Sequence, residues 1–212
     1  MTRTPHVVLL DNHDSFVYNL VDALADHPTT VFRNTVDVDT ILDADPDLIC
    51  LSPGPGHPLD AGSMMDLIAA AITRIPILGI CLGFQALLEH HGATVRPCGP
   101  VHGRSVPMTL TPAGIDHPIF HGLATDWEPD RPDIPGTQIP VARYHSLGCT
   151  DAPASLRTLA VTDTDIGPVV MAAETLDRTA IGMQFHPESI LSPTGPLMLQ
   201  RCIDALCAPD PA

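Results

Sequence analysis

The segment Gly79-Ile80-Cys81-Leu82-Gly83 constrains the fold of this chain more than any other feature of its sequence. It is preceded by the apolar run Ile75 to Ile80, typical of a buried strand, and followed by a helical pattern from Leu82 to His91. The two glycines relieve crowding in the sharp turn that joins a strand to a helix. The spacing matches the Gly-x-Ser-x-Gly elbow of hydrolases with sulfur in place of oxygen, so it predicts both an α/β architecture and a nucleophilic Cys81 thiol.

The bulk composition limits what else the chain can be. With 212 residues it can bury one sizeable core, so we expect a single domain spanning residues 1–212. The formal net charge of −15 argues against a polyanionic partner such as nucleic acid. All ten basic residues are arginine, which excludes a lysine Schiff base and the lysine of a phosphate-binding loop.

The cysteines and acidic residues are dispersed along the chain. The six cysteines form no C-x-x-C pair, and the aspartates are mostly scattered singly, as on a solvated surface. We therefore predict no metal site. Apart from Cys81, we expect the cysteines to be reduced and mostly packing thiols, namely Cys50, Cys98, Cys149, Cys202 and Cys207.

Neither a membrane span nor a signal peptide is predicted. No apolar stretch reaches the roughly 20 residues needed to cross a bilayer. The segment Met1 to His6 lacks the charged region followed by an apolar one that marks a signal peptide. We therefore expect a cytoplasmic protein without a membrane partner.

Apolar runs alternate with helical patterns in the first half of the chain. The runs are Val7 to Leu10, Leu48 to Leu51 and Ile75 to Ile80, and the helical patterns lie around Phe16 to Ala25 and Gly62 to Ile72. This alternation predicts an α/β fold with an open, mostly parallel twisted sheet and helices on both faces. In such sheets the functional loops gather at the carboxyl ends of the strands, where the Cys81 elbow lies.

The second half is richer in strands, which we expect to extend the sheet in a partly antiparallel way. A loop excursion rich in proline and aspartate is predicted at about 124–140. A last helix is predicted from Gly195 to Leu206, with Thr194 as its cap and Pro196 in its first turn. The predicted strands are Val106 to Leu110, Leu156 to Thr162, Val169 to Ala173 and Ala180 to Phe185.

His186 is the histidine best placed by sequence to activate Cys81. A thiol is a strong nucleophile only when ionised, and a nearby imidazole stabilises the ionised form. His186 follows the apolar run Ala180 to Phe185, and Glu188 comes two positions later. Because positions i and i+2 of an extended chain point the same way, we expect Glu188 to hold one imidazole nitrogen while the other faces Cys81.

Acyl transfer through a thiol also requires hydrogen-bond donors for the oxyanion. The backbone N–H of Leu82, at the start of the predicted helix, is one candidate. Gly54-Pro55-Gly56 offers bare backbone at a neighbouring strand end, and an ordinary stiff turn is the competing interpretation. Phosphate binding is disfavoured because the chain lacks lysine and the G-x-G-x-x-G spacing.

Six segments in order carry a family resemblance, namely Asp11-Asn12-His13-Asp14-Ser15-Phe16, Pro53-Gly54-Pro55-Gly56, Gly79-Ile80-Cys81-Leu82-Gly83-Phe84-Gln85, Val101-His102-Gly103-Arg104, Tyr144-His145-Ser146-Leu147 and Gln184-Phe185-His186-Pro187-Glu188-Ser189. Together they resemble the class I (triad) glutamine amidotransferases. Within that family they are similar to the branch that contains the glutamine amidotransferase components of anthranilate synthase and para-aminobenzoate synthase. The resemblance covers nearly the whole chain and implies a flavodoxin-like architecture.

The resemblance implies a role for each matching position. Cys81 would be the nucleophile that forms a γ-glutamyl thioester, His186 the base and then the acid, and Glu188 the residue that orients the imidazole. The oxyanion donors would be Gly54 and Leu82. The implied glutamine-binding residues are Gly54, Pro55, Gly56, Gln85, Ser146 and Leu147.

The resemblance also implies a reaction and a partner. The chain would hydrolyse L-glutamine and supply ammonia to a larger chorismate-binding subunit, anthranilate synthase component I, in tryptophan biosynthesis. It would need no cofactor itself, whereas the partner subunit would need Mg²⁺.

Other functions stay open at this level. The motifs also fit the glutamine amidotransferase component of aminodeoxychorismate synthase, whose partner would be aminodeoxychorismate synthase component I. We favour anthranilate synthase because 99–104 and 191–195 are more similar to tryptophan-pathway members. A stand-alone γ-glutamyl thiol hydrolase would use the same triad without a partner. A phospho-receiver, suggested by Asp11 and Asp14, is disfavoured because it would require a lysine.

Overall fold

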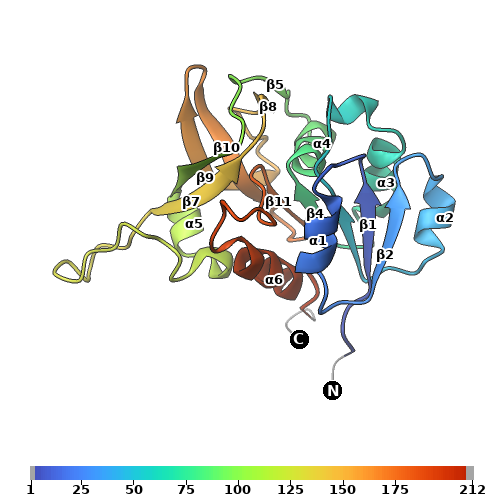
Figure 1. Cartoon of the computed structure of the whole chain (residues 1–212), viewed down its shortest axis with the longest axis horizontal. Helices are drawn as coiled ribbons and strands as arrows, with labels where there is room; N and C mark the ends of the chain where they lie inside the picture. Colours follow the sequence, from blue (N-terminus) through green and yellow to red (C-terminus); the bar gives the residue numbers. More distant parts are fainter. Residues whose placement is uncertain (1–2, 209–212) are drawn as a thin grey trace.

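The structure is a computed structural model that describes residues 3–208. Within this part of the chain, nine strands form one sheet in the order β2-β1-β3-β4-β11-β10-β9-β6-β7, and β5 pairs with β8 (Figure 1). The strands are β1 (Val7–Asp11), β2 (Thr29–Arg33), β3 (Leu48–Leu51), β4 (Ile77–Ile80), β5 (Arg96–Pro97), β6 (Arg104–Leu110), β7 (Gln138–Arg143), β8 (Leu147–Gly148), β9 (Leu156–Thr164), β10 (Gly167–Thr175) and β11 (Ala180–Met183). The helices are α1 (Val17–Ala23), α2 (Val38–Leu42), α3 (Met64–Ala71), α4 (Leu82–His90), α5 (Pro112–Ile115) and α6 (Gly195–Leu206), with short 3-10 turns η1 (Pro58–Asp60) and η2 (Pro118–Phe120).

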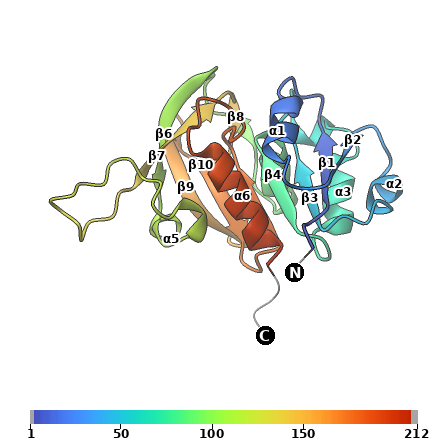
Figure 2. The ribbon, with the colours of Figure 1, turned by 60° about the horizontal axis from the view of Figure 1, so that its bottom comes forward.

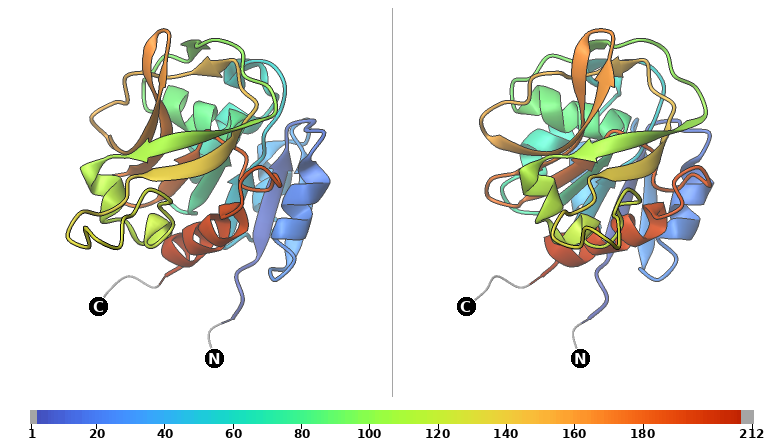
Figure 3. Two further views of the ribbon diagram at one scale, coloured as in Figure 1. Left: turned by 60° about the vertical axis from the view of Figure 1, so that its left-hand side comes forward. Right: turned by 90° about the vertical axis from the view of Figure 1, so that its left-hand side faces the viewer.

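The first five strands in this order are parallel. All residues of β1, β3, β4 and β11 are buried, as expected for strands covered on both faces. Leu9 and Cys50 pack with α1 and α6 on one face, whereas Leu10 and Leu51 pack with α2, α3 and α4 on the other. Figure 3 shows α6 lying along its face of the sheet. The predicted α/β class, with helices on both faces of an open sheet, is confirmed.

The remaining four strands, β10, β9, β6 and β7, pair antiparallel. The predicted runs at 106–110, 156–162 and 169–173 lie within β6, β9 and β10. The sequence does not predict β2, β7 or α2. β2 and β7 are the two edge strands, where partial exposure weakens the apolar pattern and where a proline such as Pro140 is tolerated. α2 is only five residues long, too short for a clear helical period.

The segment 124–137 contains no helix or strand and extends away from the sheet in Figures 1 and 2. The Asp126 carboxylate closes its base, because it accepts hydrogen bonds from Thr137 N at 2.7 Å and Gln138 N at 2.8 Å. Residues 138–140, which the sequence places in the loop, belong to β7 instead. They pair with β6, and this pairing buries Ile139 in the core.

Helix α6 spans the predicted residues, with Pro196 in its first turn. Thr194 occupies the predicted N-cap position, but its side chain makes no capping hydrogen bond, and its hydroxyl is buried without a partner within residues 3–208. β11 ends at Met183, two residues before the predicted end of that strand. None of the helices within residues 3–208 has the length and apolarity needed to cross a membrane.

Two glycines let α4 lie unusually close to the strands that precede it. A Cβ on Gly83 would overlap the Leu51 backbone and lie 2.5 Å from its Cβ, and a Cβ on Gly79 would lie 2.8 Å from the Gly83 backbone. Real Cβ atoms do not approach neighbours so closely, because atoms in protein interiors are already close-packed. These contacts determine where α4 starts, and therefore where Cys81 lies.

We predict that Gly83→Ala destabilises the protein. Alanine would favour the helix by about 1 kcal/mol, but overpacking against Leu51 costs about 1–3 kcal/mol or more and should dominate. Chemical denaturation should show a net loss of unfolding free energy. The control is Leu197→Ala on the exposed face of α6, where we expect a change within about 0.5 kcal/mol. A Gly83→Ala variant as stable as wild type would contradict this packing argument.

Candidate active site

Cys81 occupies the turn between β4 and α4 in a strained backbone conformation. Its φ of 51° and ψ of −100° are rarely adopted by a residue with a side chain. Two hydrogen bonds hold this turn: Cys81 N donates to Met183 O at 2.8 Å, and Gln85 N donates to Cys81 O at 3.0 Å. The thiol therefore has a defined position at the carboxyl edge of the sheet, at the amino end of α4.

His186 and Glu188 form a buried pair beside this turn. His186 Nδ1 lies 2.6 Å from Glu188 Oε1, and the two side chains are 5% and 1% exposed. The contact agrees with the prediction, but the reason given for it is wrong. β11 ends at Met183, and Glu188 lies in a turn rather than in extended chain. The turn is anchored where His186 N donates to Ala142 O at 3.1 Å.

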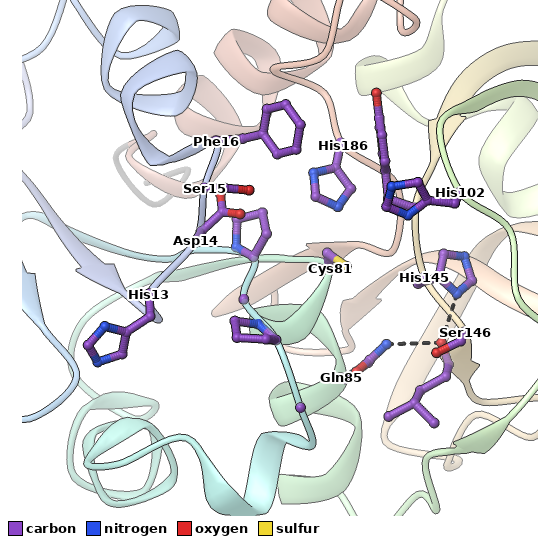
Figure 4. Close-up of a pocket in the computed structure, with 16 residues that line it drawn as sticks. His13, Asp14, Ser15, Phe16, Cys81, Gln85, His102, His145, Ser146 and His186 are labelled. Carbon is purple, nitrogen blue, oxygen red and sulfur yellow. Dashed lines mark hydrogen bonds between the residues drawn. The ribbon is translucent and has the colours of Figure 1, made fainter.

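The other imidazole nitrogen of His186 is free to act on Cys81. Nε2 is buried and makes no hydrogen bond within residues 3–208, and Figure 4 shows His186 beside Cys81 in the cavity. Burial lowers the pKa of His186, but the neighbouring Cys81 thiolate and the Glu188 carboxylate outweigh it and raise the pKa to about 11. The arrangement therefore favours a protonated imidazole next to the Cys81 sulfur.

Gly54 lies against the loop that follows β1. A Cβ at this position would be 2.7 Å from Asn12 Cβ, so only glycine fits. Asn12 is buried and joins the two loops, since its backbone N donates to Ser52 Oγ at 2.9 Å and its Nδ2 donates to Ser52 O at 3.0 Å. Leu82 is the first residue of α4, where backbone N–H groups have no partner within the helix. Gly54 lines the same cavity as Cys81, and Leu82 follows Cys81 directly in the chain.

A cavity of about 480 Å³ opens in front of Cys81. It contains most of the predicted site residues, whereas Glu188 lies behind His186 and Leu82 does not line the cavity. Within residues 3–208, no three His, Cys, Asp or Glu side chains are grouped so that they could hold a metal ion. The lining residues are His13, Asp14, Ser15, Phe16, Pro53, Gly54, Pro55, Gly56, Cys81, Gln85, His102, Tyr144, His145, Ser146, Leu147 and His186 (Figure 4).

Gln85 and Gln184 connect Cys81 to the opposite wall of the cavity. Gln85 Nε2 donates to Leu147 O at 3.0 Å and to Gln184 Oε1 at 3.2 Å. Gln184, which is fully buried, has its Nε2 at 3.7 Å from Cys81 Sγ. The sequence indicates no role for Gln184, although it opens the segment that contains His186. A buried amide must be paired, and here its partners are the thiol and Gln85.

Two aromatic rings that sequence reasoning missed surround the imidazole. The ring centroid of Tyr144 lies 4.9 Å from that of His186, and the ring of Phe16 lies at 6.3 Å. Tyr144 is tied to the same turn by a 3.2 Å hydrogen bond between its hydroxyl and Ser189 Oγ. These contacts limit the movement of His186. The sequence offers one indication of a role for these two rings: Phe16 and Tyr144 belong to two of the six segments that carry the family resemblance.

Asp14, also missed as a site residue, lies in the cavity wall close to the imidazole. Burial raises its pKa, and its Oδ2 is buried without a hydrogen-bond partner within residues 3–208. Its backbone N donates to Asp11 Oδ1 at 3.1 Å, and Asp11 in turn pairs with Arg33 at 3.1 Å. Of the two carboxylates that suggested a phospho-receiver, Asp14 lines the cavity, and Asp11, the last residue of β1, holds the loop that carries Asp14.

Comparison with known proteins agrees with this geometry. The family model for glutamine amidotransferase class-I matches residues 8–206. The chain is 63% identical over 205 residues to anthranilate synthase component 2 of Corynebacterium glutamicum, covering 96% of this chain and 99% of that protein. It is 37% identical over 214 residues to anthranilate synthase component 2 of Halobacterium salinarum, covering 96% and 99% of the two chains.

The fold is also found among solved structures. A glutamine amidotransferase of Thermotoga maritima superposes with a TM-score of 0.66 at 14% identity, covering 96% of this chain and 100% of that one. At this identity the likeness concerns the fold alone. The family match over almost the whole chain and the high identity to its relatives decide the classification: this chain belongs to the class I glutamine amidotransferase family.

Proposed function

We propose that this chain is the glutamine amidotransferase subunit of anthranilate synthase, which hydrolyses L-glutamine and supplies ammonia for the amination of chorismate by a larger partner subunit. The observation that carries the proposal is that Cys81, at a strained strand-to-helix turn, lines the same cavity as His186, whose imidazole is paired with the buried Glu188 carboxylate. The 63% identity to an anthranilate synthase component 2 supports the pathway and the partner, component I.

In the first step the Cys81 thiolate attacks the side-chain amide carbon of glutamine. A C–S bond forms, and the carbonyl electrons move onto the oxygen, where the N–H groups of Gly54 and Leu82 stabilise the negative charge. The C–N bond then breaks as His186 Nε2 gives its proton to the leaving nitrogen, which departs as ammonia. A γ-glutamyl thioester on Cys81 remains.

In the second step water attacks the thioester and His186 Nε2 accepts its proton. The C–S bond breaks, the Cys81 thiolate is restored, and glutamate leaves. Glu188 holds Nδ1 of the imidazole throughout, so the ring keeps its orientation and its charged form is stabilised. Each step uses only groups of this chain and water, so the proposed reaction requires no cofactor here, and Mg²⁺ would serve the partner subunit.

The cavity volume of about 480 Å³ is sufficient for one glutamine. In the proposed binding mode, the side-chain amide lies between Cys81 and the Gly54-Pro55-Gly56 turn. Gln85 contacts the substrate, and the backbone of Ser146 and Leu147 binds its α-amino and α-carboxylate groups. This orientation points the reacting carbon at the thiol.

The nucleophile can be tested in the assembled complex. Cys81→Ser should reduce glutamine-dependent product formation by about 10³-fold or more, because the hydroxyl is not ionised at neutral pH. Product formation from ammonium ions should stay near the wild-type rate, since amination occurs on the partner. Loss of both activities would contradict the proposed division of labour, and retention of both would contradict the role of Cys81.

The charge state of His186 gives a second test. A raised pKa means that the imidazolium persists at neutral pH and is lost only as the pH rises towards about 11. In Cys81→Ser the pKa of His186 should fall, because the thiolate contributes most to raising it. Nuclear magnetic resonance of labelled histidine during a pH titration measures both values. Cys202→Ser, which removes a buried thiol of α6, should leave the titration unchanged. A wild-type His186 that titrates near 6.5 would contradict the ion pair.

Growth experiments test the pathway. Deletion of the gene should create a requirement for tryptophan and none for para-aminobenzoate, because the relatives with high identity are anthranilate synthase components. Complementation with the intact gene should restore growth. A para-aminobenzoate requirement without a tryptophan requirement would assign the chain to aminodeoxychorismate synthase instead.

A further inference from the structure

Arg143, the last residue of β7, is a buried cation without a counter-ion. It is 5% exposed, and none of the ion pairs among residues 3–208 includes it. A buried charge without a counter-ion is costly, even when it is hydrogen-bonded. Neither the fold nor the proposed chemistry described above uses this charge, so its burial calls for another explanation.

The contacts of Arg143 are made to neutral groups behind the cavity wall. Its Nε donates to His145 Nε2 at 3.0 Å, and its Nη2 donates to Cys98 Sγ at 3.6 Å. A guanidinium can only donate hydrogen bonds. His145 Nε2 must therefore be the unprotonated nitrogen, and the ring proton must be on Nδ1.

With its proton on Nδ1, His145 can hold the proposed substrate-binding segment Ser146-Leu147 in place. Its Nδ1–H donates to Leu147 O at 2.7 Å, and Gln85 Nε2 donates to the same oxygen at 3.0 Å, as the dashed lines in Figure 4 show. The adjacent carbonyl, Ser146 O, accepts from Cys98 N at 2.9 Å. Both carbonyls of the segment are thus hydrogen-bonded to the protein, which fixes the conformation of its backbone.

The electrostatics of the wall agree with this arrangement. Burial, and then the charge of Arg143, lower the pKa of His145 to about 3, so His145 stays neutral. Arg143 therefore keeps a permanent positive charge against His145, the residue that precedes the Ser146-Leu147 segment. A buried charge is weakly screened by salt and acts through a low dielectric.

We propose that Arg143 is a specificity-determining residue that makes the cavity select ligands with a free α-carboxylate. It acts in two ways: through His145 it holds the Ser146-Leu147 segment in its binding conformation, and its unpaired charge becomes balanced when an α-carboxylate binds there. Arg143 does not touch the reacting atoms. The inference rests on the proposed function, because the α-carboxylate is that of L-glutamine.

The test compares two substrates in the reconstituted complex. L-Glutaminamide carries a neutral amide in place of the α-carboxylate but keeps the side-chain amide that Cys81 attacks. We expect wild type to prefer L-glutamine by kcat/KM, and Arg143→Met to lower this preference about tenfold. The loss should appear mainly as a raised KM for L-glutamine, with kcat for L-glutamine changed less than about threefold.

Arg104→Met is the matched control. Arg104 lies directly opposite Arg143 in the β6–β7 pair but is exposed, so the variant removes a nearby charge without affecting the buried one. We expect its substrate preference to equal that of wild type. An Arg143→Met enzyme that loses activity equally with both substrates, or keeps the wild-type preference, would overturn the proposal.

Two further measurements keep the test decisive. Arg143→Gln removes the charge but keeps a donor, and it should lower the preference for L-glutamine if Arg143→Met does not fold. In the wild-type protein, nitrogen resonance spectra at neutral pH should show a neutral His145 protonated on Nδ1; protonation on Nε2 would overturn the proposed contact. A wild-type complex that forms no product from L-glutamine would instead overturn the proposed function itself.

Discussion

The candidate active site depends on one close approach, that of helix α4 to strands β3 and β4. A side chain on Gly83 would overlap Leu51, and one on Gly79 would overlap Gly83. Because the helix begins directly after the strand, the residue between them must adopt a φ of 51°, and that residue is Cys81. The packing that strains this backbone also places the thiol at the cavity, with the amino end of α4 beside it.

The two parts of the sheet contribute different functions to the cavity. The parallel part supplies Cys81, the proposed nucleophile, after β4, the His186 turn after β11 and the Gly54 turn after β3. The antiparallel part supplies the Ser146-Leu147 segment, the proposed substrate-binding segment, which follows β7 and has Arg143 behind it. The proposed chemistry and the proposed substrate selection therefore depend on different strands. A hydrogen-bonded path through Gln184 and Gln85 connects them.

Much of the fold could be predicted from the sequence, but some of its strands could not. The strands covered on both faces were predicted because their apolar runs are continuous, as in β1 and β3. The edge strands β2 and β7 were missed because their patterns mix buried and exposed residues. The His186–Glu188 contact was expected on the geometry of extended chain, whereas a turn produces it. Spacing alone does not distinguish these two conformations.

The sequence by itself determined the α/β class and the family and predicted Cys81 as the nucleophile, because glycine spacing and apolar periodicity can be read from neighbouring residues along the chain. Only the tertiary structure decided which distant groups meet. Leu147 O lies between His145 and Gln85, and Gln85 is 62 positions away along the chain. The buried charge of Arg143 is likewise invisible in sequence, because the presence of a counter-ion depends on the register and packing of strands far apart in the chain.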